Sequence, residues 1–98
     1  MSALPILVSP EAELDFDRFL ASLETHSKRA ATRSRVRVER ILQQLAAGLE
    51  GREVLLLDGR RVRRWVVDDD LVIYYQRTSS ALEVARIRHA RATTIEDV

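Results

Sequence analysis

The sequence contains no cysteine, and it has only three glycines, two prolines and two histidines. Without cysteine there can be no disulfide, thiolate metal site or cysteine nucleophile. The imidazole groups available for metal binding or catalysis are those of His26 and His89. We therefore expect no zinc or haem enzyme and predict neither a metal site nor a cofactor. The glycines Gly48, Gly51 and Gly59 form no phosphate-binding loop, which argues against nucleotide hydrolysis.

Long hydrophobic runs are also missing. Apolar runs such as residues 54–57 are far shorter than the roughly 20 residues of a membrane-spanning helix, and we recognise no secretion signal at the N-terminus. We expect a soluble, cytoplasmic protein with no membrane contact. The 98 residues fit one domain, 1–98, whose small core must be held by apolar packing alone.

The net charge of +1 hides a strong division of the charges into blocks. Residues 11–24 are mainly acidic and residues 28–40 mainly basic, and further basic clusters lie at 60–64 and 86–91. All but one of the 16 basic residues are arginine. Arginine binds phosphate and carboxylate in a bidentate fork, so these clusters suit a nucleic acid or an acidic protein partner; solvated faces are the alternative.

The first half of the sequence predicts a strand followed by two helices. An apolar run at 4–8 precedes Ser9 and Pro10, which are typical of the start of a helix. Apolar residues then recur at the helical period on residues 12–23 and again on residues 29–48. The join at 25–28 is short, so the helices should form an antiparallel hairpin.

The second half has a period of two and predicts strands at 54–57, 61–67, 71–77 and 82–89. Asp58 and Gly59 indicate a two-residue type I′ turn. Residues 92–98 should form a tail or an edge strand. The predicted fold class is α+β, with a short N-terminal strand, an antiparallel two-helix hairpin and a mostly antiparallel meander sheet whose helices pack on one face.

The turns predict which way each strand residue faces. Three-residue loops at 68–70 and 78–80 would place Val67 opposite Leu71 and Arg77 opposite Ala81. The face expected to receive the helices then carries Trp65, Val67, Leu71, Ile73, Tyr75, Ala85 and Ile87. The other face carries Val62, Val66, Val72, Tyr74, Leu82 and Val84 among Arg64, Gln76, Arg86 and Arg88. This second face is half apolar and basic, so it should be covered or used, and we interpret it as the functional face.

Several charged groups have simpler interpretations. Four carboxylates are expected on a solvated face of the first helix, where they favour its N-terminus: Glu11, Glu13, Asp15 and Asp17. The acidic run 68–70 is a turn without calcium-site spacing. His89 differs, since Arg88 and Arg91 flank it at the end of a strand and make it a candidate base.

Two segments carry a family resemblance. Residues 69–75 read DDLVIYY and residues 82–91 read LEVARIRHAR. At this spacing, after a strand and two helices, they resemble the ParE/RelE superfamily of toxins from bacterial type II toxin-antitoxin modules, and the ParE branch in particular. The resemblance implies a small α+β domain bound by a cognate antitoxin, which wraps it with a helix and an extended segment.

The branch of the superfamily decides the function. ParE-like members bind DNA gyrase and block replication, whereas RelE-like members cleave mRNA on the ribosome. The nuclease branch is expected to carry an arginine where this chain has Val72, and a tyrosine or histidine near the C-terminus, but no tyrosine follows Tyr75. Gyrase inhibition is therefore the first interpretation. Ribosome-dependent mRNA cleavage is the alternative, and a degenerate toxin that only binds its antitoxin is the third.

The candidate residues follow from these interpretations. For target or antitoxin binding they are Arg64, Tyr74, Arg86, Arg88, His89 and Arg91. No catalytic residue is expected under the gyrase interpretation. Under the nuclease alternative, His89 would activate the 2′-hydroxyl, and Arg88 and Arg91 would stabilise the charged phosphorane.

Overall fold

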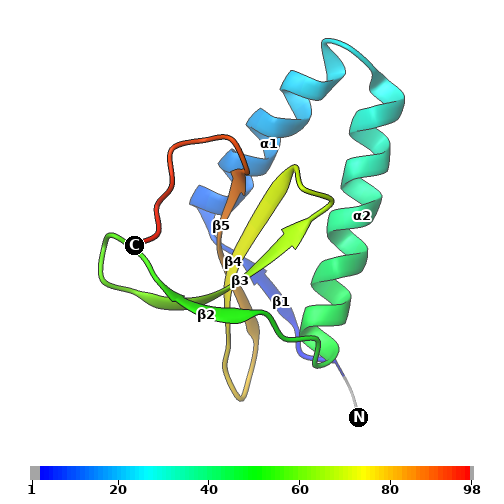
Figure 1. Cartoon of the computed structure of the whole chain (residues 1–98). Helices are drawn as coiled ribbons and strands as arrows, with labels where there is room; N and C mark the ends of the chain where they lie inside the picture. The colour runs from blue at the N-terminus through cyan, green and yellow to red at the C-terminus, as the bar shows by residue number, and fades with distance from the viewer. Residues whose placement is uncertain (1–2, 98) are drawn as a thin grey trace.

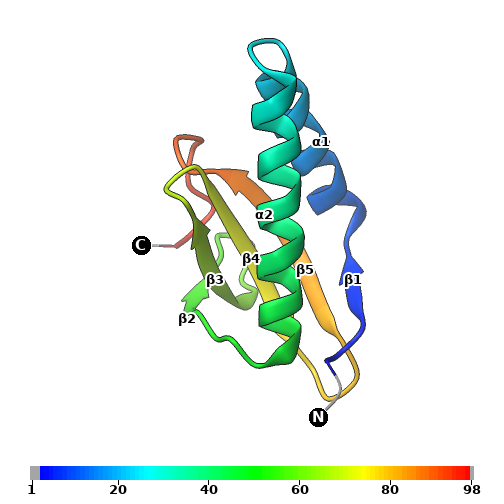
Figure 2. The same cartoon turned by 90° about the vertical axis from the view of Figure 1, so that its right-hand side faces the viewer.

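In the computed structural model, which describes residues 3–97, a short strand leads directly into a helical hairpin (Figure 1). Strand β1 (Ile6–Val8) is followed by Ser9, whose hydroxyl accepts the Ala12 N–H at 3.0 Å and caps α1 (Pro10–Glu24). Ser27 caps α2 (Lys28–Ala47) in the same way, and Gly48 ends it with a φ of 128°. The helices lie side by side in Figure 2. The predicted hairpin is confirmed.

Within residues 3–97, five strands form one mixed sheet. After α2 come β2 (Arg52–Leu55), β3 (Arg61–Val67), β4 (Leu71–Arg77) and β5 (Leu82–His89), and the order across the sheet is β1-β5-β4-β3-β2. Strand β1 pairs with β5 in parallel, and the other neighbours are antiparallel. This is the predicted α+β class. Neither helix is long and apolar enough to cross a membrane.

Most of the predicted facing is correct, but β5 departs from it at two points. The last turn is one residue longer than expected, so that Arg77 pairs with Leu82. A β-bulge then lies opposite Tyr74 and Tyr75, because Tyr75 pairs with Val84 while Tyr74 pairs with Arg86. Each irregularity shifts the register by one residue, and together they restore the predicted facing from Arg86 onward.

The shifted segment changes sides. Leu82 and Val84, predicted on the second face, are fully buried in the core cluster beneath the helices. Ala85, predicted on that core face, is only half-buried and is not part of the cluster. These three assignments were wrong because a one-residue slip turns every following side chain to the opposite face.

The first hairpin is also wider than predicted. Leu55 pairs with Arg61, and the Gly59 N–H donates to the Leu56 carbonyl at 2.9 Å. A type I′ turn needs positive φ at both Asp58 and Gly59. Gly59 has a φ of 90°, but the non-glycine residues with positive φ within residues 3–97 are Asp68 and Asp69. The predicted two-residue turn is therefore wrong, and β2 begins and ends two residues earlier than expected.

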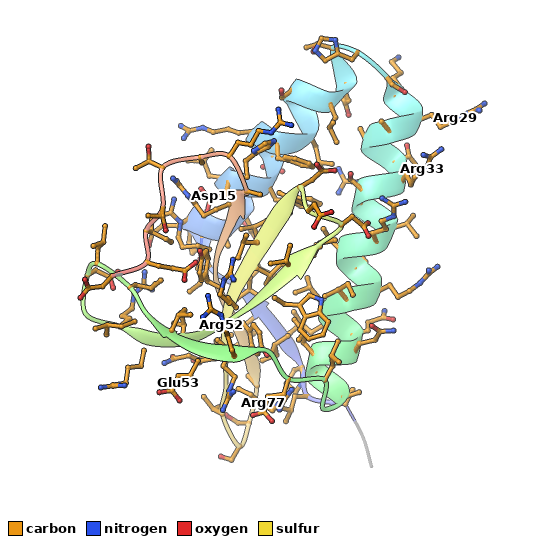
Figure 3. All side chains as sticks on the ribbon, in the orientation of Figure 1. Asp15, Arg29, Arg33, Arg52, Glu53 and Arg77 are labelled. Carbon is orange, nitrogen blue, oxygen red and sulfur yellow. The ribbon has the colours of Figure 1, made fainter. Side chains whose placement is uncertain are left out.

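Arg77 joins the sheet to the end of α2. Its guanidinium donates to the carbonyl of Leu45, and its Nη2 also donates to the Leu49 carbonyl at 2.7 Å. The last carbonyls of a helix have no partners within the helix, and a cation is favourable at that end of the helix dipole. The last residue of β4 therefore caps α2 (Figure 3).

Replacing Arg77 by methionine should lower the free energy of unfolding by about 2 kcal/mol, because the apolar chain is kept while charged hydrogen bonds to the helix end are lost. Urea unfolding followed by circular dichroism measures this cost. Arg61→Met, at an exposed position, is the control and should change stability by less than about 0.5 kcal/mol. Equal costs for the two variants would contradict a capping role.

Candidate functional site

The second face of the sheet is covered at its centre by the chain's own C-terminal segment. Leu57 N–H donates to the Ile95 carbonyl at 2.7 Å, and Asp97 N–H donates to the Leu55 carbonyl at 2.8 Å. Ile95 packs against a second apolar cluster formed by Leu56, Val62, Val72 and Tyr74. Of the predicted tail, residues 95–97 therefore pair with residues 55–57 at the end of β2, and Figure 1 shows the segment running there from the end of β5. Val98 lies outside the described residues.

Glu96 anchors this segment to the basic residues beneath it. Its Oε2 accepts the Tyr74 hydroxyl at 2.7 Å and lies 3.2 Å from Arg64 Nε, while its Oε1 lies 3.8 Å from Arg52 Nη2. The Glu96 side chain is only 12% exposed. One mostly buried carboxylate thus lies against two arginines, Arg64, which the sequence placed on the basic face, and Arg52 of β2.

The surroundings of Tyr74 alter its ionisation. Tyr74 is 3% exposed, and burial, followed by its hydrogen bond to Glu96, raises the pKa of the phenol to about 12. The nearby Arg64 guanidinium opposes this shift of the pKa only in part. Tyr74 is therefore a neutral hydrogen-bond donor at physiological pH.

Arg88, His89 and Arg91 lie where β5 ends and the C-terminal segment begins. Arg88 Nη2 donates to the Thr93 carbonyl at 2.9 Å. His89 is exposed, and its Nδ1 accepts the backbone N–H of Arg91 at 3.0 Å. Its ring lies 5.7 Å from that of Phe19, centroid to centroid. His89 is therefore on the helix side of the sheet, whereas Arg64, Tyr74 and Arg88 are on the other.

Two cavities meet at Arg88 and His89. The larger, of about 340 Å³, lies between α1 and the end of β5, with Phe19 and Ile87 in its lining. The smaller, of about 160 Å³, lies beneath residues 92–96 beside Arg64 and Tyr74. Four of the six candidate residues therefore line these two cavities around the end of β5, namely Arg64, Tyr74, Arg88 and His89, and Arg91 is exposed next to them.

Arg86 is separate from this group. It makes a bidentate ion pair with Asp15 of α1, with Nε 2.7 Å from Oδ2 and Nη2 2.9 Å from Oδ1. Asp15 Oδ2 also accepts the Ile87 N–H at 3.1 Å, and the Asp15 side chain is 11% exposed. The hydrogen bond to Asp15 raises the pKa of Arg86. The expectation that Asp15 lies on a solvated face was wrong, because the residue flanks the apolar stripe of α1 and reaches the edge of β5.

Residues 6–93 of the chain match the family described as the ParE toxin of type II toxin-antitoxin system, parDE. The chain belongs to this family. The resemblance seen in the sequence is thereby confirmed, and the protein is the toxin of a toxin-antitoxin system. Comparison with curated proteins gave no match. The family also supports an antitoxin as a partner of this toxin.

The toxin's candidate residues offer little for acid–base catalysis. Tyr74 keeps its proton to high pH, and the Nδ1 lone pair of His89 is engaged by a backbone N–H. Arg86 and Arg64 already face carboxylates. Within residues 3–97, no group of three or more histidine, aspartate and glutamate side chains is arranged to hold a metal ion.

Sequence reasoning missed Glu96 and Asp15, the two carboxylates that organise the toxin's arginines. The spacing of Asp15 from Ala12 and Phe19 could have indicated a position at the edge of the apolar stripe, since residues three and four apart are neighbours on a helix. Glu96 gave no such signal, because it lies in a segment without periodicity.

The toxin should lose stability in alkaline solution through Tyr74. Below pH 10 the phenol is protonated in both states, so its contribution is constant. Between pH 10 and 12 the unfolded chain releases the proton and the folded chain keeps it, so the free energy of unfolding should fall by roughly 2–3 kcal/mol. Urea unfolding across this range, compared with Tyr74→Phe, isolates the effect; parallel pH profiles of the two proteins would contradict it.

Asp15→Asn should destabilise the toxin by about 2–3 kcal/mol, because it removes the bidentate partner of the Arg86 guanidinium and leaves only the more distant, exposed Glu11 as a counter-ion. Asp17→Asn, two residues along on the exposed face of α1, removes the same charge and should cost less than about 0.5 kcal/mol. Thermal and urea unfolding of both variants measure the difference. A cost for Asp15→Asn as small as that of Asp17→Asn would show that the ion pair contributes little.

Proposed function

We propose that this toxin inhibits DNA gyrase and that its cognate antitoxin neutralises it by binding directly. The family supports a toxin with an antitoxin partner. The choice of gyrase over mRNA rests on one observation: the groups that an RNA-cleaving site requires are absent or engaged elsewhere. This favours a toxin that acts by binding.

Cleavage of RNA requires a base for the 2′-hydroxyl and cations for the charged phosphorane. Val72, at the place of the arginine expected in the nuclease branch, is buried in the second apolar cluster beneath the C-terminal segment. Arg64 faces Glu96, and Arg86 faces Asp15. His89 remains as a candidate base, since it lines the smaller cavity together with Arg64 and Arg88, but its Nδ1 already accepts the Arg91 N–H.

The same geometry divides the candidate contact residues. Tyr74 is buried, and Arg64 and Arg86 are largely engaged within the toxin, so we propose that these three support the surface. His89 and Arg91 are exposed beside the larger cavity and can reach a partner. We propose His89 and Arg91 as direct contacts with gyrase or the antitoxin, and Arg88 as the residue that positions the segment after β5 through its hydrogen bond to the Thr93 carbonyl.

The purified toxin should inhibit DNA supercoiling by gyrase and should leave mRNA on translating ribosomes intact. Addition of the cognate antitoxin should restore supercoiling. Joint replacement of His89 and Arg91 by alanine should weaken inhibition about tenfold or more, as expected when central contacts of an interface are truncated. Arg61→Ala, exposed on β3, is the matched control and should inhibit like the unaltered toxin.

Ribosome-bound mRNA provides the opposing test. Cuts in the message that appear with the toxin and vanish with His89→Ala would overturn gyrase inhibition and establish the nuclease alternative. A folded toxin that binds its antitoxin but affects neither gyrase nor mRNA would instead identify it as a degenerate toxin.

A further inference from the structure

The outer side of α2 carries an arginine ridge, formed by Arg29, Arg33 and Arg40. All three are exposed on the side of the helix opposite the buried Val38 and Leu42. Figure 3 shows Arg29 and Arg33 extending away from the sheet into solvent. None of the ion pairs formed among residues 3–97 includes a ridge arginine.

The ridge is unfavourable for the helix that carries it. Arg29 and Arg33 are four residues apart, as are Arg33 and Arg37, and like charges at this spacing repel. Lys28 and Arg29 also occupy the first turn of α2, which contains no acid, although the helix dipole disfavours cations there. The acidic α1 lies alongside, yet no ion pair in the described structure joins the two helices. An external polyanion would relieve this repulsion.

We propose that the α2 arginine ridge binds the phosphate backbone of double-stranded DNA. By the geometry of an α-helix, Arg29 and Arg33 are about 6 Å apart along the axis and Arg33 and Arg40 about 10 Å. The ridge therefore spans about 16 Å, close to five base-pair steps of B-DNA. Guanidinium groups pair with phosphate in a bidentate fork, so three of them on one rigid helix can follow a duplex backbone.

The composition of the ridge argues for duplex DNA over other polyanions. Recognition of single strands relies on aromatic side chains that stack on bases, and α2 contains no aromatic residue. Protein interfaces and membrane-surface helices rely on clustered large apolar side chains. In the described part of α2, the large hydrophobic residue that is exposed is Val36, at 46%, and a single such residue does not form an apolar cluster. Binding should therefore be electrostatic and insensitive to DNA sequence.

The test uses the full-length toxin and a fluorescein-labelled 30-base-pair duplex of arbitrary sequence, with binding followed by fluorescence anisotropy. Combined replacement of Arg29, Arg33 and Arg40 by glutamine should weaken binding at least tenfold at 50 mM salt. The dependence of log affinity on log salt should become shallower by about 2–3, because each lost phosphate contact contributes about 0.9. Circular dichroism verifies that the variant is folded, as the exposed positions predict.

The matched control replaces Arg18, Arg60 and Arg61, three exposed arginines outside α2, with glutamine. It removes the same charge and should bind the duplex within about twofold of the unaltered toxin. Equal losses in the two variants would show that only net charge matters and would overturn the proposal. So would an unaltered toxin that fails to bind the duplex, or one that binds only anionic vesicles or an acidic protein. The assay contains no gyrase, so its outcome is independent of the proposed target.

Discussion

The rest of the structure depends on one requirement, which is that the backbone groups on the edge of β5 beyond Val84 find hydrogen-bond partners. Strand β1 ends at Val8 and pairs with β5 only as far as Val84. The remaining backbone groups of that edge need other partners, because buried unpaired N–H and C=O groups are costly. Ser9 supplies two of them, since its N–H donates to the Val84 carbonyl and its hydroxyl to the Ala85 carbonyl. Asp15 then accepts the Ile87 N–H, so the start of α1 serves as the continuation of the edge strand.

This arrangement explains why the bulge lies where it does. At Ala85 the hydrogen-bond partners of the β5 edge change from the backbone of β1 to side chains at the start of α1. The extra residue of the bulge lies at that same point. Sequence periodicity predicted the order of the elements, both helices and most of the core, because these depend on local patterns. It could not predict the bulge, which lies where β1 stops pairing with β5, a contact far away in sequence. It also could not predict the longer turn, which is closed locally by Thr78, whose N–H donates to the Ala81 carbonyl and whose hydroxyl accepts the Ala81 N–H, because alternation along a strand does not report such bonds. Leu82 and Val84 were placed on the wrong face for that reason.

The candidate site was predictable in composition but not in arrangement. The sequence singled out Arg64, Arg86 and Arg88 from their alternation along the strands, and these residues do lie on or beside the second face. What alternation cannot reveal is the partner of each guanidinium. Glu96 lies 32 residues from Arg64 in the chain and reaches it only because the C-terminal segment pairs with Leu56. Asp15 reaches Arg86 across 71 residues because α1 is held at the edge of β5.

The arginines of the toxin therefore fall into two kinds with different physical consequences. Arg77, Arg86 and Arg64 are partly buried, and each faces a carbonyl group or a carboxylate of its own chain. Removing such a partner leaves a charge in a poorly solvated place, so their role is structural. The ridge arginines of α2 are solvated and form no ion pair within residues 3–97, and Arg29 and Arg33 repel each other, so these charges do not stabilise the helix. A cluster of charges that opposes its own element suits an external partner, and the alignment of Arg29, Arg33 and Arg40 along one side of the helix suits a linear polyanion.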